Sequence, residues 1–464
     1  MKFREEEDTM GTVRVPEDAY YGSQTQRAAD NFPISGILLP TEFIRSLAMI
    51  KKFAAQVNFE LELLEKPVSE AIAQAAAEVI AGKFGDQFVV DVFQTGSGTS
   101  TNMNMNEVLA TRGNEILTGQ KSMKVPIHPN DHVNMGQSSN DVIPTTLHLA
   151  ALTSIQDRLL PALDILHAVL LQKTSDFEKV IKIGRTHLQD AVPLTLGQEF
   201  SGYARQVELG MQRLQGIEKR LGELALGGTA VGSGLNAHPE FAGRVIRKIA
   251  DHTGIAFTEA VNHFEAQAAR DAAVEASGML KTIAVSLTKI ANDIRWLASG
   301  PRCGLGEINI PALQPGSSIM PGKVNPVIPE AMLQVAAQVM GNDTTIMLGG
   351  QSGNFELNVS IPVIAHNLLQ SIRLLASGVE VFTEKCIKNI SANREACAAN
   401  IEKSLAMVTG LVPHIGYEKA AAIAKKAFAS GRTVRDIAMT EKVLSEDLLN
   451  QILDPNPNKP ELKI

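Results

Sequence analysis

Four short polar segments contain the side chains of this sequence that could do chemistry. Each is rich in small hydroxyl, amide or glycine residues, and each lies at a break beside a stretch with helical periodicity. Small hydrogen-bond donors at the start of a helix can hold a carboxylate, because the first N–H groups of a helix lack partners and carry partial positive charge. The segments span residues 94–108, 128–144, 183–191 and 316–326.

The first two segments read QTGSGTSTNMNMNEV (94–108) and HPNDHVNMGQSSNDVIP (128–144), and both lead into a predicted helix. Hydroxyl and amide side chains in this position suit a carboxylate ligand. Ordinary helix N-capping, including capping by Asn140 or Asp141, is the alternative interpretation of each residue taken alone. The candidate ligands are Ser97, Thr99, Ser138, Ser139 and Asn140.

The second segment also contains His128, Asn130 and Asp131. Imidazole, amide and carboxylate groups this close in sequence could form a metal or anion site. A hydrogen-bonded turn is the simpler explanation of the same three residues.

The third segment, IGRTHLQDA (183–191), contains His187 directly after Arg185 and Thr186. Histidine changes its charge near neutral pH, so His187 could transfer a proton. A single histidine among ten is also commonly structural, and the sequence alone leaves both roles open.

The fourth segment, GSSIMPGKVNP (316–326), is a loop that combines hydroxyl, ammonium and amide groups between glycines and prolines. Glu330 follows it in the first turn of a predicted helix, where a carboxylate also complements the helix dipole. Lys323 could equally be an ordinary solvated lysine. The candidate residues of the loop are Ser317, Ser318, Lys323 and Asn325.

Together the four segments predict a site that holds a small dicarboxylate and moves protons. Neither the zinc motif H-E-x-x-H nor the nucleophile motif G-x-S-x-G occurs. The glycine-rich GTAVGSG (228–234) lacks the consecutive Lys and Ser/Thr residues that end a phosphate loop. We therefore predict an enzyme that uses no metal and no other cofactor.

The composition narrows the class of protein further. The 464 residues carry a formal net charge of -7 without a run of Lys or Arg, so a nucleic-acid partner is not expected. No window of 18 uncharged apolar residues predicts a membrane span. The three cysteines match neither a disulfide framework nor a thiolate metal site, and the N-terminus lacks the apolar region of a secretory signal. These features favour a cytoplasmic protein with reduced thiols.

Long helices must position the four segments. Only 5% of the residues are aromatic, and apolar residues recur at spacings of three and four. A helix over residues 262–299 would be about 55 Å long, too long for a compact domain, so we predict an elongated bundle that shares apolar faces with other subunits. The clearest apolar seam is formed by Leu280, Ile283, Leu287, Ile290, Ile294 and Leu297.

The loop at 316–326 resembles the signature G-S-S-x-M-P-x-K-x-N-P of the fumarase/aspartase superfamily. The likeness extends through EDAYYGSQTQRA (17–28), GRTHLQDA (184–191), GGTAVGSGLN (227–236) and SGNFELNV (352–359), and it covers nearly the whole chain. Within the superfamily the sequence most resembles class II fumarase, the iron-independent fumarate hydratase. Aspartases typically read QGGAGTS and STND where this chain has QTGSGTS and SSND.

The resemblance implies an all-α fold of three domains with a central five-helix bundle. It also implies a homotetramer with a twenty-helix core, whose active sites each draw residues from three subunits. We expect the domains to span residues 1–138, 139–393 and 394–464, the middle one being the long-helix bundle.

The same resemblance implies a role for each candidate residue in the reversible hydration of fumarate to (S)-malate, a step of the tricarboxylic acid cycle. Ser317 is the expected base, with His187 acting at the hydroxyl end of the substrate and Glu330 pairing with His187. His128, Asn130 and Asp131 match a second anion site. The expected substrate-binding residues are Ser97, Thr99, Ser138, Ser139, Asn140, Thr186, Ser318, Lys323 and Asn325.

Two alternatives belong beside this prediction. The first is aspartate ammonia-lyase, because aspartases share much of the framework and GNDTTI (341–346) is similar to them. The second is a helical oligomer without activity, as in relatives recruited as structural lens proteins. Such proteins often lose site residues, whereas this chain retains Ser317, Lys323, Asn325, His187 and Glu330.

Overall fold

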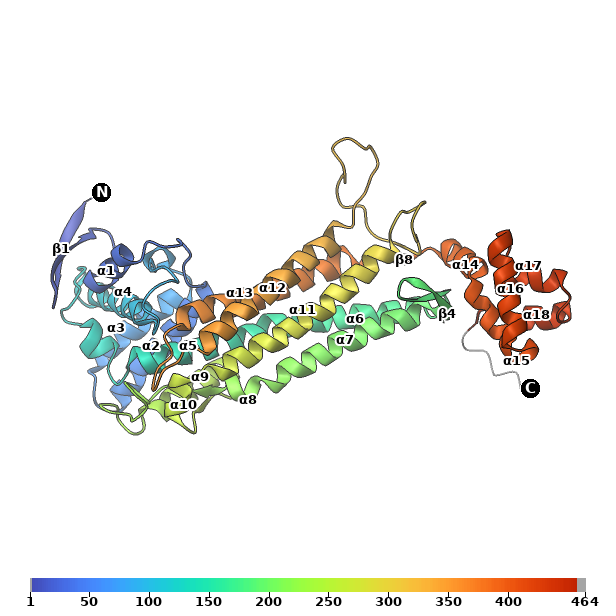
Figure 1. The fold of residues 1–464 in the computed structure, drawn as a ribbon. Coiled ribbons are helices and arrows are strands. Elements are labelled where there is room, and N and C mark those ends of the chain that lie inside the picture. Colours follow the sequence, from blue (N-terminus) through green and yellow to red (C-terminus); the bar gives the residue numbers. More distant parts are fainter. Residues whose placement is uncertain (1, 457–464) are drawn as a thin grey trace. The chain divides into compact units, whose positions relative to one another are not determined.

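The computed structural model describes residues 2–456 and confirms a mainly α-helical fold (Figure 1). Strands occur in the described part of the chain only as pairs: β1 with β2, β3 with β4, β5 with β6 and β7 with β8. Three pairs are antiparallel, and the two-residue pair β5–β6 is parallel. The strands are β1 (Phe3–Asp8), β2 (Gly11–Pro16), β3 (Ile181–Thr186), β4 (Gln189–Thr195), β5 (Glu223–Leu224), β6 (Thr258–Glu259), β7 (Ile308–Asn309) and β8 (Ser391–Ala392).

The helices form a nearly continuous series along the chain. The first half contains α1 (Ser23–Asn31), α2 (Thr41–Glu60), α3 (Lys66–Ile80), α4 (Thr99–Thr118), α5 (Ser139–Ser154), α6 (Leu160–Asp176), α7 (Leu196–Gly216) and α8 (Glu218–Leu221). The second half contains α9 (Phe241–Thr253), α10 (His263–Ala268), α11 (Asp271–Leu297), α12 (Val327–Gly350), α13 (Ile361–Lys385), α14 (Arg394–Lys403), α15 (Val412–Ile415), α16 (Tyr417–Ser430), α17 (Val434–Thr440) and α18 (Glu446–Ile452). Short 3₁₀ and π turns complete the series: η1 (Gly85–Gln87), η2 (Pro129–Val133), η3 (Ile155–Leu159), η4 (Ile387–Asn389) and η5 (Leu405–Leu411).

The chain divides into two compact units. The first comprises residues 1–161, 211–284 and 336–376, and the second comprises residues 162–210, 285–335 and 377–464.

The first unit is built around α2, which packs against α3, α5 and α9. Phe43, Leu47, Ile50, Ala54 and Val57 of α2 follow spacings of four and three, and none is exposed to solvent. This stripe is the buried face of an amphipathic helix. In the same unit α11 is tied to α12, because Ser277 and Lys281 donate to the Asp343 carboxylate at 2.7 and 2.6 Å.

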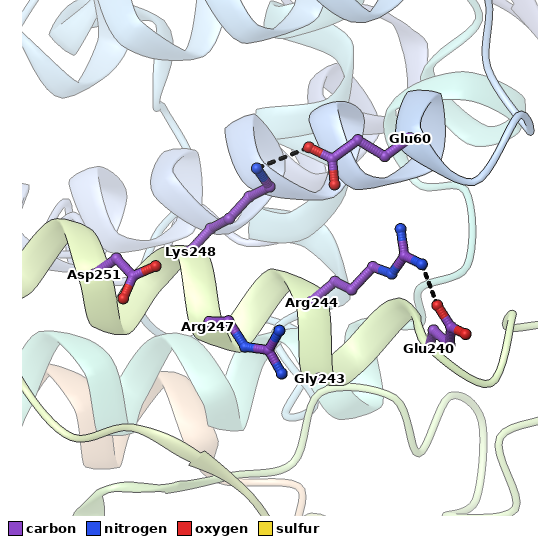
Figure 2. Close-up of a pocket in the computed structure, with 7 residues that line it drawn as sticks. All are labelled: Glu60, Glu240, Gly243, Arg244, Arg247, Lys248 and Asp251. Atoms are coloured by element: carbon purple, nitrogen blue, oxygen red, sulfur yellow. Dashed lines mark hydrogen bonds and ion pairs between the residues drawn. The ribbon is translucent and has the colours of Figure 1, made fainter.

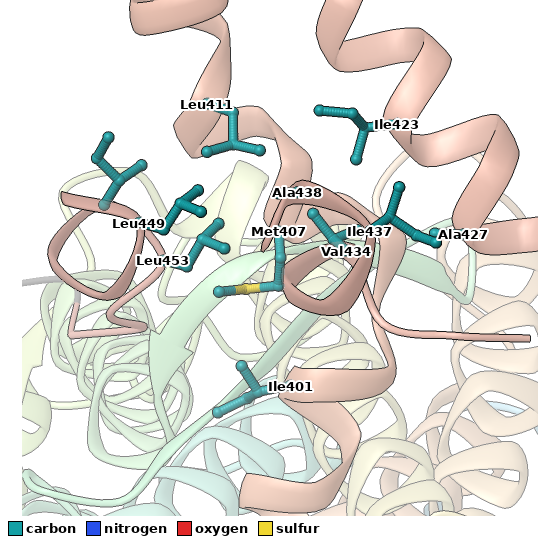
Figure 3. Packing of buried hydrophobic residues seen from close by; sticks show 11 residues of the cluster. Ile401, Met407, Leu411, Ile423, Ala427, Val434, Ile437, Ala438, Leu449 and Leu453 are labelled. Atoms are coloured by element: carbon teal, nitrogen blue, oxygen red, sulfur yellow. The ribbon is translucent and has the colours of Figure 1, made fainter. Parts of the chain in front are cut away.

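The second unit contains the β3–β4 hairpin and the C-terminal helices α14–α18. Burial of small and branched apolar side chains organises these helices, which are too short to be stable alone (Figure 3). Ile181 of β3 packs against the same cluster, so the hairpin is anchored to the C-terminal helices. The cluster consists of Ile401, Met407, Leu411, Ile423, Ala427, Val434, Ile437, Ala438, Leu449, Ile452 and Leu453.

The seam predicted within residues 280–297 is confirmed, since all six of its members are buried in α11. The prediction of one helix over residues 262–299 is wrong at its N-terminal end. Ala269 has an extended backbone and ends α10, and α11 begins at Asp271. Asn262 caps α10 by accepting from the Glu265 N–H at 3.1 Å. The apolar spacing used for the prediction began at Leu280 and carried no information about this break.

None of the described helices is long and apolar enough to cross a membrane. The three cysteines are free, with Cys303 exposed and Cys386 and Cys397 buried.

Candidate functional site

A cavity of about 480 Å³ in the first unit collects most of the candidates from the first two segments. It opens where α4 and α5 begin, and no carboxylate or basic side chain is among its described lining residues. The polar groups available to a ligand are therefore neutral hydroxyls and amides. The lining includes Gln24, Thr99, Asn102, Asn130, Asn134, Gln137, Ser138, Ser139, Asn140, Thr229 and Asn236.

Thr99, Asn102 and Met103 at the start of α4 form the first wall of this cavity, and Ser97 in the preceding turn does not line it. Gly98 precedes the helix with a φ of 76° and has no side chain to cap it, but the Gln94 side chain accepts from the Thr101 N–H at 3.1 Å. The Ser97 and Thr99 hydroxyls lie 2.9 Å apart. Gly96 allows this turn to pass close to residue 359, because a Cβ at position 96 would lie 1.6 Å from the Val359 carbonyl oxygen.

The second wall is the start of α5. Ser138 is the N-cap and accepts from the Asn140 N–H at 3.2 Å, while Asp141 accepts from the Ser138 N–H at 2.9 Å. This reciprocal capping box bears out the capping alternative for Ser138 and Asp141. The Asn140 side chain donates to the Ala230 carbonyl at 2.8 Å and so holds residues 229–236 beside the cavity.

A buried amide network lies behind both walls. The Asn134 Oδ1 atom accepts from Asn102 and Asn106 at 3.1 Å each, and Asn102 also donates to the Ser139 hydroxyl at 3.0 Å. The side-chain oxygens of Asn102 and Asn106 have no hydrogen-bond partner within the described chain, although both are buried. A buried acceptor without a hydrogen-bond partner costs free energy of folding. A ligand that donates a hydrogen bond to either oxygen would remove that cost.

Two buried ionisable residues support the network. Lys51 of α2 donates to Asn134 Oδ1 at 3.0 Å and to Gln137 Oε1 at 2.9 Å. Burial lowers the pKa of Lys51 to about 7, against the opposing charge of Asp141. Burial raises the pKa of Asp141 to about 6, although backbone N–H groups of Ser138, Thr229 and Gly227 lower it.

His128, Asn130 and Asp131 form a hydrogen-bonded turn, the simpler of the two interpretations of these residues. His128 precedes η2, and its Nδ1 accepts from the N–H groups of Asn130 and Asp131 at 3.2 Å each. His128 and Asn130 also line a separate cavity of about 690 Å³, together with Arg27 and Lys124. Glu7, Asp8 and Glu107 line this cavity as well, and Arg27 pairs with Asp8 at 2.8 Å.

His187 lies at the tip of the β3–β4 hairpin in the second unit. Thr186 pairs with Gln189, so His187 and Leu188 alone form the two-residue turn. Their φ angles are 55° and 58°, a region that such turns usually fill with Asn and Gly. Non-glycine residues held at positive φ cost energy and concentrate at functional sites. Both side chains are exposed, so the imidazole projects into solvent in the isolated chain.

A buried ionic cluster holds the base of this hairpin. The Arg185 guanidinium makes two hydrogen bonds with the Glu307 carboxylate, at 2.7 and 3.0 Å, and Lys182 lies 3.4 Å from the same carboxylate. Glu307 and Lys182 are almost fully buried. Burial alone would raise the pKa of Glu307, but the Arg185 hydrogen bonds and the Lys182 charge bring it below its usual value.

The loop at 316–326 folds back on itself. The Gly316 N–H donates to the Lys323 carbonyl at 2.7 Å, and the Asn325 side chain donates to the Gly316 carbonyl at 2.7 Å. The Ser317 hydroxyl accepts from the N–H groups of Ile319 and Met320, at 3.2 and 3.0 Å. Two backbone donors thus point at the hydroxyl oxygen of Ser317, the expected base.

The other loop candidates lie differently. Ser318 and Lys323 are exposed, and Asn325 is half-buried. Glu330 is in the first turn of α12, as the dipole interpretation predicted. Within the described part of a single chain, Glu330 and His187 form no ion pair with each other. The pairing of these two residues therefore stays a prediction.

One further cavity, of about 570 Å³, lies on the surface of α9 (Figure 2). Arg244, Arg247 and Lys248 line it, but three acidic residues line it too. Lys248 pairs with Glu60 at 2.8 Å and Arg244 pairs with Glu240. Because two of these three cations already have carboxylate partners, the α9 cavity is a poorer anion site than the cavity at α4 and α5. Across residues 2–456 no group of His, Cys, Asp or Glu could hold a metal ion.

Several residues around the cavity were not among the predicted site residues. Asn134 and Gln137 lie in the loop before α5. Lys51 carried a detectable signal, because it occupies the apolar stripe of α2, four residues after Leu47. A lysine at a core position of an amphipathic helix is unusual and warrants attention.

Comparison with known protein families gives two matches. A family model described as a lyase matches residues 11–341, and a model described as the fumarase C C-terminus matches residues 407–457.

Comparison with individual proteins agrees with these matches. The chain is 55% identical to the class II fumarate hydratase of Nitrosomonas europaea, over 98% of both chains. It is 53% identical to the mitochondrial fumarate hydratase of Rhizopus oryzae, over 98% of this chain and 92% of the relative. The crystal structure of class II fumarase from Schistosoma mansoni has a TM-score of 0.94, with 40% identity over 98% of both chains.

Proposed function

Because the chain belongs to the class II fumarate hydratase family of lyases, we propose that it interconverts fumarate and (S)-malate by anti addition and elimination of water. This is the hydration step of the tricarboxylic acid cycle, and we propose that it takes place in the cytoplasm. The free cysteines suit a reducing compartment.

One observation of the structure carries this proposal: a cavity lined by neutral donors where two helices begin. The start of α4 has no acidic residue in its first turn and presents partial positive charge, which favours an anion, whereas Asp141 already occupies the capping box of α5. A dicarboxylate bound here meets hydroxyl and amide groups and no competing carboxylate. Thr99, Ser138, Ser139 and Asn140 would hold its two carboxylates, with Ser97 close to Thr99.

Ser317 is the proposed base that removes a proton from C3 of malate. The C–H electron pair moves into the neighbouring carboxylate, which becomes a doubly charged aci-carboxylate. A serine hydroxyl is too weak an acid to ionise unaided, so its alkoxide needs preorganised donors. The Ile319 and Met320 N–H groups, both directed at Ser317 Oγ, support this role. Lys323 and Asn325 would bind the charge that develops, with Ser318 beside them.

His187 is proposed to act at C2 of malate, the carbon that carries the hydroxyl group. As the C2–O bond breaks, an imidazolium can give its proton to the departing hydroxide, which leaves as water. Glu330 from another subunit would orient the ring and stabilise its charged form, and Thr186 would bind the same end of the substrate. The strained turn at His187 and its exposure support a group presented to a neighbouring chain.

We further propose that the working form is a homotetramer with active sites shared between three subunits. Large apolar side chains on the long helices support this, because about half of each remains exposed in a single chain. They are Val285 and Trp296 of α11, Met347 and Leu348 of α12, and Val381 of α13. Exposed apolar surface of this kind marks an interface between proteins. His128, Asn130 and Asp131 are proposed as a second anion site.

The test is to incubate the purified protein with fumarate, with and without ammonium, and to follow fumarate absorbance. Loss of absorbance without ammonium, with malate as product, supports the hydratase. Loss only with ammonium would indicate aspartate ammonia-lyase, and no loss under either condition would indicate a protein without this activity.

A further inference from the structure

Lys51 is a buried ammonium without an ion-pair partner. Its side chain is inaccessible to solvent, and both of its hydrogen-bond acceptors are neutral amide oxygens, those of Asn134 and Gln137. No carboxylate in the described chain forms an ion pair with it. Burying a charge against neutral groups alone is costly, and most buried charges are therefore paired. We therefore expect an anion near Lys51 that compensates its charge.

Asp141 compensates this charge only in part. The elements packed against α2 are α3, α4, α5, α9 and η2, and among their described groups Asp141 of α5 is the one whose charge acts on Lys51. Both Asp141 oxygens face backbone N–H groups instead, those of Ser138, Gly227 and Thr229. Burial also raises the pKa of Asp141 to about 6, so that carboxylate is itself poorly stabilised as an anion.

The missing anion has an obvious place to bind. Asn134 and Gln137 line the cavity at the start of α4 and α5, so Lys51 lies one side chain behind its wall. The amide nitrogens of both residues also donate within the chain, because Asn134 donates to the Gln137 carbonyl and Gln137 donates to the carbonyls of Val133 and Met135. Lys51 therefore fixes which way both amides point.

Resting on the proposed function, we propose that Lys51 is a positioning residue that serves as the counter-charge of the bound dicarboxylate. It holds the Asn134 and Gln137 amides in the cavity wall, and its ammonium attracts the dianion from behind that wall. Lys51 does not touch the substrate and takes no proton from it.

This role links binding to protonation. In the empty protein, burial lowers the pKa of Lys51 to about 7, so the ammonium is lost as the pH rises above that value. A dianion in the cavity favours the ammonium form and raises this pKa. Binding above pH 7 must therefore take up a proton, and affinity for the dianion must fall as the pH rises. A purely structural lysine would show neither effect.

The experiment measures proton uptake by isothermal titration calorimetry at pH 8, in two buffers with different ionisation enthalpies. Succinate is the ligand, because it is a dicarboxylate that can be neither hydrated nor dehydrated. The wild-type protein should take up on the order of 0.5–1 proton per site. Lys51→Met should lose most of this uptake and bind succinate roughly tenfold or more weakly, the effect of one charge at short range.

The matched control is the neighbouring Lys52→Met. Lys52 is half-buried, with its ammonium 5.4 Å from the Phe53 ring, and it makes no contact with the cavity. This variant should keep both the proton uptake and the affinity of the wild type. Uptake by His187 is separated by His187→Asn, which should retain the Lys51 contribution.

Three results would overturn the proposal: wild-type affinity in Lys51→Met, equal proton uptake in Lys51→Met and wild type, or no uptake in His187→Asn. Circular dichroism would reveal whether Lys51→Met folds. If it does not, the absence of proton uptake in His187→Asn would still refute the proposal. Malate–fumarate turnover of the wild type is measured first. Its absence refutes the proposed function, whereas turnover without Lys51-dependent uptake refutes only the role of Lys51.

Discussion

Replacing Glu307 with glutamine should disrupt the second unit more than any surface change of equal size. Glu307 has no exposed surface, and its carboxylate receives two hydrogen bonds from Arg185 and lies 3.4 Å from Lys182. The amide would leave the nearly buried Arg185 guanidinium without its carboxylate partner, whereas Lys182 keeps its ion pair with Glu199 at 3.3 Å. Removing one partner of a buried ion pair costs about 3–5 kcal/mol, because the remaining charge is uncompensated.

The assay is urea unfolding followed by the fluorescence of Trp296, the only tryptophan of the chain. Trp296 lies in α11 within the second unit, so it reports on the unit that contains Glu307. With a urea dependence of about 2 kcal/mol per molar, the expected cost lowers the unfolding midpoint by about 1.5–2.5 M. Hydratase activity should fall as well, because Arg185 and Lys182 anchor the hairpin that presents His187.

The pH dependence has a defined sign. The pKa of Glu307 is below its ordinary value of 4.5 in the folded protein, so its stabilising effect is present above pH 4.5 and is lost as the pH falls through the folded pKa. The difference between wild type and Glu307→Gln should therefore shrink in acid.

Glu384→Gln is the matched control for this experiment. Glu384 belongs to the same unit, but its ion pair with Lys388 is exposed on both sides. Exposed pairs contribute about 0–1 kcal/mol, so the midpoint should barely move. The reasoning fails if Glu307→Gln unfolds at the same urea concentration as Glu384→Gln.

Two further predictions concern the site itself. Gly96→Ala should lower the thermal unfolding temperature and cut activity at least tenfold, because the new Cβ would lie 1.6 Å from the Val359 carbonyl oxygen; Gly85→Ala, where nothing lies within 4 Å, should be near neutral in both assays. Ser317→Ala and His187→Asn should each reduce turnover by roughly 10²–10⁴, while size-exclusion chromatography shows the same oligomeric state as the wild type. Near-normal turnover in either variant would remove that residue from the mechanism.

Much of the fold follows from the sequence because helical periodicity is a strong local signal. The seam from Leu280 to Leu297 places α11 correctly, and the acidic start of α12 at Glu330 agrees with the helix dipole. The break between α10 and α11 was not predicted, because Ala269 is a good helix former and only its tertiary context makes its backbone extended.

The candidate site shows the same division. Local motifs identified Thr99, Ser138 and Asn140, which the fold brings to one cavity from two helices. The hydrogen bond from Lys51 to Asn134 behind this cavity joins residues 83 positions apart, and it depends on how α2 packs. Likewise the Arg185–Glu307 pair spans 122 positions, a distance at which spacing alone gives no signal.

The central claim, that this chain hydrates fumarate between a base and an acid on opposite faces, is tested most directly in heavy water. The protein is incubated with fumarate in D₂O without ammonium, and the malate formed is analysed by proton NMR. We predict a single 3-deuterated (S)-malate diastereomer, in which deuterium and hydroxyl entered from opposite faces. A mixture of diastereomers, or no malate without ammonium, would contradict the account.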